Sequence, residues 1–192
     1  MKTLLEQKKF QSYYTENKYI SEFMSLELDL SDDDILLEPA AGKGDLIDAV
    51  LDVNQTIRIQ AFDIDPLAIQ TLSEKYGANE RITITQADTL TTNEFAFEKF
   101  DKIIANPPWG ANLSEVKSKL NDLYSQYSAL ESYSLFLVKA LKMLKSGGKL
   151  VFIIPDTYLF VHKQEKLRKY ILKNFTINKI VRFPSNFFTG IG

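Results

Sequence analysis

Short apolar runs alternate with longer amphipathic stretches along most of the chain. The runs that predict strands are 35–37, 57–62, 82–85, 102–105, 150–154 and 177–183. The stretches that predict helices are 16–28, 46–51, 66–76, 132–145 and 163–173. Strands that alternate with helices are typical of a mostly parallel sheet. The sequence therefore predicts an α/β fold, with a doubly wound sheet that carries helices on both faces.

Particular residues mark two of the expected helix ends. Asp65 stands where it can cap a helix that begins at Pro66, a residue well suited to the first helical position. Gly147 and Gly148 follow the stretch 132–145 and are expected to close that helix.

The composition narrows the possible chemistry. A chain of 192 residues fits one domain, and 45% hydrophobic with 25% charged residues is ordinary for a globular fold. With no cysteine and one histidine, His162, disulfides, thiolate zinc sites and cysteine nucleophiles are excluded, and no metal site is expected. No apolar run is long enough to cross a membrane, and the lack of cysteine suits a reducing cytoplasm.

The charge is unevenly distributed along the chain. The formal net charge is −2, yet residues 163–182 contain seven Lys or Arg against one acid, Glu165. Such a patch can steer a polyanion locally, although a solvated amphipathic helix has the same pattern.

Small and acidic residues follow the first three predicted strands. Glu38 opens a loop rich in alanine and glycine, whose backbone can turn tightly and approach a ligand. Asp63 lies 21 residues after Gly42, the spacing at which an acid binds a ribose in doubly wound folds. Asp88 follows the third strand. Each acid alone is more often a cap or turn residue, but three at neighbouring strand ends favour a nucleoside-containing ligand.

The fourth strand is followed by Asn106-Pro107-Pro108-Trp109. Two prolines fix the backbone and remove two N–H donors, so the segment is a rigid loop. It presents an amide, a carbonyl and the single tryptophan of the chain at the expected ligand site. A rigid surface turn would not require these residue types.

These motifs, in this order, resemble those of S-adenosylmethionine-dependent amino methyltransferases. The resemblance is closest to the gamma class of DNA adenine-N6 methyltransferases, which includes type I modification subunits and type II relatives. It covers nearly the whole chain, with residues 1–30 as an N-terminal segment and 31–192 as the Rossmann-like core. The cofactor residues that it implies are Thr15, Glu38, Ala40, Gly42, Asp63, Ile64, Asp88 and Asn106. Glu16 stands where the family usually has proline, which weakens the assignment of the Thr15 motif.

The chemistry of the Asn106 loop fits amine methylation. The exocyclic amine of adenine is a poor nucleophile, and acceptors for its N–H groups free its lone pair. The Asn106 side-chain oxygen and the Pro107 carbonyl are two such acceptors, which with Pro108 and Trp109 form the expected catalytic loop. Trp109 and Phe187 are expected to stack on the base, which must be flipped out of duplex DNA.

The same residues are also compatible with other functions. Methyltransferases that act on ribosomal RNA or on a release-factor glutamine resemble the chain at the Asn106 motif, and a non-catalytic cofactor-binding module is a third possibility. N4 of cytosine suits the same pocket as N6 of adenine.

Sheets of this class end in an antiparallel strand, which we expect to be absent here. DNA recognition is then expected to need a further C-terminal part or a separate specificity subunit.

Overall fold

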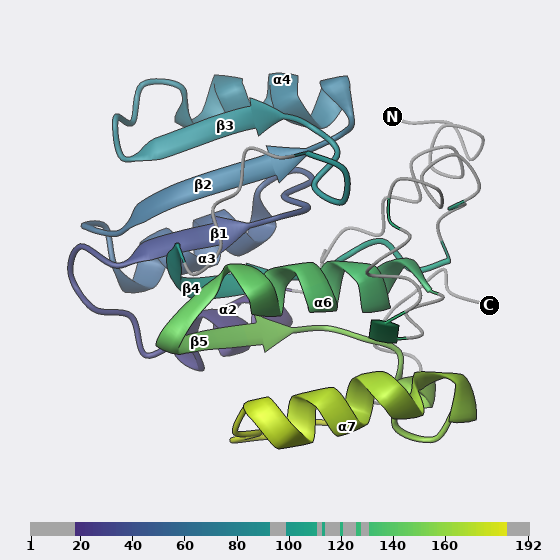
Figure 1. Ribbon diagram of the computed structural model, residues 1–192. Coiled ribbons are helices and arrows are strands. Elements are labelled where there is room, and N and C mark those ends of the chain that lie inside the picture. Colours follow the sequence, from purple (N-terminus) through teal and green to yellow (C-terminus); the bar gives the residue numbers. More distant parts are fainter. Residues whose placement is uncertain are drawn as a thin grey trace.

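The strands form one parallel sheet. The computed structural model describes residues 18–92, 99–110, 113, 120, 126–127 and 131–183. The strands in this part are β1 (Ile35–Glu38), β2 (Arg58–Asp63), β3 (Ile82–Gln86), β4 (Phe100–Ala105) and β5 (Leu144–Phe152). Their order is β3-β2-β1-β4-β5, and every pairing is parallel (Figure 1). The predicted doubly wound α/β fold is confirmed, and the described residues contain no antiparallel strand.

Helices cover both faces of this sheet. The α-helices of the described part are α2 (Lys18–Leu26), α3 (Asp45–Val53), α4 (Pro66–Tyr76), α6 (Ser132–Met143) and α7 (Glu165–Asn174). Two short 3-10 helices, η1 (Asp156–Leu159) and η2 (His162–Gln164), precede α7. Residues of α2, α3 and α4 share one buried cluster, whereas α6 packs on the opposite face (Figure 1). No helix in the described ranges is long and apolar enough to span a membrane.

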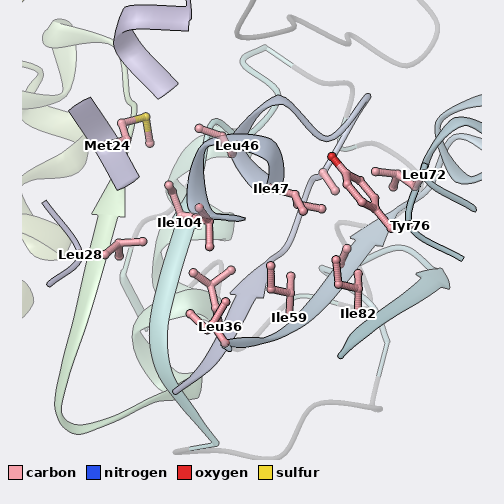
Figure 2. Close-up of a cluster of buried hydrophobic side chains, with 14 of the residues drawn as sticks. Met24, Leu28, Leu36, Leu46, Ile47, Ile59, Leu72, Tyr76, Ile82 and Ile104 are labelled. Atoms are coloured by element: carbon pink, nitrogen blue, oxygen red, sulfur yellow. The ribbon is translucent and has the colours of Figure 1, made fainter. Parts of the chain in front are cut away.

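Alternation along β1 builds the two cores. Leu36 packs with Ile59 and Ile104 under α2 and α3, as Figure 2 shows. Its neighbour Leu37 points to the other face and joins the cluster that contains Met143 of α6. Both leucines are completely buried, and burial of one such side chain is worth about 1.5–3 kcal/mol. The continuous apolar run in the sequence therefore reflects a strand that is covered on both sides.

The predicted end of the helix at 132–145 is wrong. Helix α6 ends at Met143, and Leu144 already has extended geometry and begins β5. Gly147, with φ of +77°, lies inside β5. There the ladder to β4 shifts register between Phe100 and Lys102. The two glycines therefore accommodate an irregular strand and do not cap a helix.

The predicted strand at 177–183 is also wrong. These residues have no ladder partner within the described part of the chain. Ion pairs hold the segment instead, from Lys179 to Glu27 at 2.5 Å and from Arg182 to Asp156 at 2.8 Å. A groove of about 2140 Å³ borders β5, α7 and this segment. Apolar residues such as Ile177 and Ile180 suggested a strand, but they are exposed.

Candidate active site

The site lies where the chain reverses its direction across the sheet. From β1 the sheet extends to β2 and β3 on one side, and to β4 and β5 on the other. Such a switch point creates a crevice between the loops that follow two neighbouring strands. Here these loops begin at Glu38, after β1, and at Asn106, after β4. The two motifs singled out in the sequence therefore flank one crevice.

The loop after β1 is fastened to the end of β2. Gly42 has a φ of +55°, in the left-handed region that favours glycine. Its N–H donates to Oδ2 of Asp63 at 2.7 Å, and the Ala41 N–H donates to the Phe62 carbonyl at 2.8 Å. The predicted ligand residues Gly42 and Asp63 are thus in direct contact.

Asp63 already orders the backbone around it. Its Oδ1 accepts a hydrogen bond from the N–H of Asp65 at 2.8 Å, while Oδ2 accepts from Gly42. A carboxylate has about four acceptor positions, so one carboxylate can accept from several donors at once. Asp65 caps α4, with its side chain accepting from the Leu67 N–H at 3.0 Å, as predicted. Between them, Ile64 is half exposed beside the site.

Glu38 is a completely buried acid. Its Oε1 accepts from the Ala40 N–H at 3.2 Å, and its Oε2 has no partner among the described residues. Burial raises the pKa of Glu38 well above its ordinary value, and the nearby charge of Asp63 raises it further. A buried carboxyl with one unsatisfied oxygen is suited to a cationic or hydrogen-donating ligand group.

Asp88 shapes the turn after β3. Its carboxylate accepts from the Leu90 N–H and from the Thr91 hydroxyl, both at 2.9 Å. The buried Thr89 donates to the Pro39 carbonyl at 2.6 Å, which joins this turn to the loop after β1. Asp88 is therefore a turn residue, and its turn lies against the candidate site.

Sequence reasoning missed Lys139 of α6. Its Nζ donates to the carbonyls of Leu90 and Thr92, at 3.0 and 2.9 Å, and holds the turn after β3. Burial lowers the pKa of Lys139 to about 8, and the charge of Asp88 opposes this shift. One feature of the sequence could have drawn attention to it: Lys139 is the single charged residue in the stretch 132–141.

The loop after β4 is fixed by packing and by one hydrogen bond. The Ser132 hydroxyl donates to the Pro108 carbonyl at 2.5 Å. Trp109 packs against both the α2–α3 cluster and the cluster around α6. No donor among the described residues is bonded to the Pro107 carbonyl, and Asn106 is partly buried beside it. Asn106 and Pro107 thus follow β4 directly at the switch point, with Oδ1 of Asn106 buried.

The structure brings most of the predicted site residues to one edge. Glu38 and Asp63 end β1 and β2, and Ala40, Gly42, Asp88 and Asn106 follow the carboxyl ends of β1, β3 and β4. Thr15 and Phe187 lie outside the described residues. Within the described ranges, no group of three or more His, Asp or Glu side chains could hold a metal ion.

Comparison with known proteins gives the family. Residues 50–188 match the Eco57I restriction-modification methylase family. The chain belongs to that family. Among its curated relatives, the type II methyltransferase M.HincII of Haemophilus influenzae is 30% identical over 164 residues. This alignment covers 81% of the chain but 30% of the relative, so the chain spans less than a third of that protein. A shorter match, 31% identical over 105 residues and 54% of this chain, is to ribosomal RNA small subunit methyltransferase A of Prochlorococcus marinus, of which it covers 38%.

Solved structures place this family member in a methyltransferase fold. A protein of Listeria monocytogenes, assigned as a class I S-adenosylmethionine-dependent methyltransferase, has a TM-score of 0.68 at 21% identity, covering 86% of this chain and 53% of the other. The methyltransferase subunit of a type I restriction-modification system from Streptococcus thermophilus has a TM-score of 0.64 at 20% identity, covering 86% and 39%. At these identities the likeness concerns the fold alone.

Proposed function

We propose that this chain is the catalytic core of a restriction-modification enzyme that transfers a methyl group from S-adenosylmethionine to N6 of a flipped adenine in DNA. The observation that carries this proposal is the rigid Asn106–Trp109 loop at the switch point, beside the Glu38–Gly44 loop. Family membership supports the same reaction class.

The residues at the strand ends fit the groups of the cofactor. Asp63 is proposed to accept from the ribose hydroxyls, and Asp88 from the adenine amine. Glu38 keeps one buried oxygen unpaired among the described residues, which suits the α-ammonium group. Ala40 and Gly42 present a backbone that can approach closely. When bound, S-adenosylmethionine supplies an electrophilic methyl group, so no metal is needed for this chemistry.

The catalytic loop acts on the target amine by positioning it. The Asn106 side-chain oxygen and the Pro107 carbonyl accept hydrogen bonds from the amine, which localises the nitrogen lone pair. Trp109, held by packing on two sides, stacks on the base, a contact worth about 1–3 kcal/mol. Methyl transfer needs the donor and acceptor about 3–3.5 Å apart and in line, so correct placement lowers the barrier.

Substrate and partners follow from the same proposal. The substrate is duplex DNA, and recognition of its sequence needs a target-recognition region or a specificity subunit in addition to this core. The protein would act on host DNA in the cytoplasm of a prokaryote. The match to a ribosomal RNA methyltransferase favours RNA as the second candidate substrate.

A methyl-transfer assay separates these substrates. The purified protein, supplied with its target-recognition region or specificity subunit, is incubated with labelled S-adenosylmethionine and either duplex DNA, ribosomal RNA or a release factor, and modified products are identified by mass spectrometry. We expect N6-methyladenine in DNA and none with Asn106→Ala. N4-methylcytosine would change the target base, label on RNA or a release-factor glutamine alone would change the substrate, and absence of transfer to all three would contradict catalysis.

A further inference from the structure

The proposed mechanism leaves the basic, exposed side of α7 unused. Residues 162–174 carry five Lys or Arg and one acid, Glu165. Glu165 forms ion pairs with Lys169, at 2.6 Å, and with His162, at 3.1 Å. Lys163, Lys166 and Lys173 are exposed, and no carboxylate of the described residues lies within ion-pair distance of them. Two cations on α7 and one on the preceding η2 are therefore available for an external partner.

Helical spacing places two of these lysines, Lys166 and Lys173, on one side of α7 together with Lys169. Lys166, Lys169 and Lys173 are three and seven positions apart, which places them along one stripe of the helix. At about 1.5 Å per residue, Lys166 and Lys173 are separated by about 10.5 Å along the axis. One DNA strand carries a phosphate about every 3.4 Å of its axis, so this stripe matches about three phosphate steps.

The other side of α7 is anchored to the wall of the active site. Leu167 is completely buried, and Tyr170 and Ile171 pack against the same cluster as Trp109. The Arg168 guanidinium donates to the carbonyls of Tyr158 and Val161, at 2.7 and 2.8 Å. The lysine stripe is thus held in a fixed position relative to the loop that carries Trp109.

The beginning of α7 lies at the same edge of the sheet as the crevice. The chain leaves β5 at its carboxyl end, passes through η1 and η2, and then runs back beside β5 as α7 (Figure 1). Lys163 and Lys166 therefore stand near the edge where the target base must enter, and Lys173 stands further back. A backbone that lies along α7 would pass the mouth of the site.

We infer that Lys163, Lys166 and Lys173 form a docking face for the phosphate backbone of the DNA substrate, beside the base that is methylated. This inference rests on the proposed DNA substrate. Contacts of this kind orient the duplex without reading its sequence. They make binding depend on salt, because each neutralised phosphate releases counterions.

The test compares two triple variants of equal charge. Lys163→Gln, Lys166→Gln and Lys173→Gln remove the docking face. Lys18→Gln, Arg58→Gln and Arg81→Gln are the control, since these exposed residues lie on α2 and at the amino ends of β2 and β3. Both variants lower the net charge by three. Binding of a labelled 24-base-pair duplex is measured by fluorescence anisotropy between 50 and 200 mM salt. Thermal melting and calorimetry with S-adenosylmethionine check that both variants fold and bind the cofactor.

The expected result is a change specific to α7. Loss of three phosphate contacts reduces the magnitude of the slope of log K against log salt by about 2.7. At 0.1 M salt this change corresponds to roughly 500-fold weaker binding. The control triple should keep the slope of the unmodified protein. Equal weakening in both triples would overturn the docking face while leaving the DNA substrate intact. Failure of the unmodified protein to bind DNA, or tenfold tighter binding to a ribosomal RNA hairpin, would instead overturn the proposed function.

Discussion

Gly44, the residue before α3, offers a quantitative test of how the candidate cofactor loop is built. Its φ is +88°, and an added Cβ would lie 2.7 Å from the Tyr76 hydroxyl oxygen and 3.0 Å from Cδ2 of Leu72. Tyr76 cannot swing away, because its hydroxyl donates to the Gly44 carbonyl at 3.0 Å and its ring is buried (Figure 2). We therefore expect Gly44→Ala to add both backbone strain and a steric clash.

Gly147→Ala is the matched control. Gly147 has a similar φ of +77°, but nothing lies within 4 Å of its Cβ position. The left-handed conformation costs a non-glycine residue about 1–2 kcal/mol. The lower entropy of the unfolded alanine chain offsets about 0.4–1 kcal/mol of that cost. The control should lose about 1 kcal/mol or less, whereas overpacking at Gly44 adds about 1–3 kcal/mol.

Thermal denaturation measures the difference between the two variants. For a chain of this size, 1 kcal/mol shifts Tm by about 2–4 °C. We expect Gly147→Ala to lower Tm by about 4 °C or less and Gly44→Ala by about 4–16 °C. Calorimetry should also show weaker S-adenosylmethionine binding for Gly44→Ala alone. Equal Tm losses in the two variants would refute the argument that Tyr76 and Leu72 leave no space at Gly44.

Three further predictions concern the candidate site. Asp63→Ala should weaken S-adenosylmethionine binding at least tenfold in calorimetry, because it removes the proposed ribose acceptor and the partner of the Gly42 N–H; unchanged affinity would remove Asp63 from the site. Asn106→Ala should bind the cofactor nearly normally but lose methyl transfer by 100-fold or more, since its proposed contact is confined to the target amine; retained turnover would refute that role. Burial raises the pKa of Glu38 in the folded protein. Above the ordinary glutamate pKa of 4.5, the unfolded chain therefore releases a proton that the folded protein keeps, and the free energy of unfolding falls as pH rises. Glu38→Gln should remove this decline between pH 5 and pH 8 in urea denaturation, and an unchanged decline would contradict the burial argument.

The sequence predicted the elements whose pattern is local. Four of the five strands of the described sheet were expected within two residues, because runs such as Ile35–Leu37 reflect burial on both faces. The fifth, β5, begins six residues before its predicted start. The cap at Asp65 was also expected, because capping depends on neighbouring residues. The segment 177–183 was mistaken for a strand because a strand requires a partner ladder, which an apolar pattern alone does not reveal.

The candidate site, like the fold, has features that the local sequence predicted and features that it did not. Acids at strand ends could be predicted, because parallel strands align their carboxyl ends at one edge. The bonds that connect the loops could not, since they join distant parts of the chain. Thr89 bonds to Pro39, 50 residues away, and Lys139 bonds to Leu90, 49 residues away. The role of Asp88 in its own turn was foreseen as the ordinary alternative, whereas the contact of its turn with α6 was not.

These connections bear directly on how the proposed reaction would be accelerated. The loop after β1 is joined to β2 through Gly42 and Asp63, and to the turn after β3 through Thr89. Helix α6 holds both that turn, through Lys139, and the proposed catalytic loop, through Ser132. Each candidate loop is therefore fixed by the protein itself. An amine methylation that depends on alignment gains most from such a site, because little reorganisation remains to be done when the substrates bind. Thr89, Ser132 and Lys139, for which no substrate contact is proposed, thus help to fix the geometry of the candidate site.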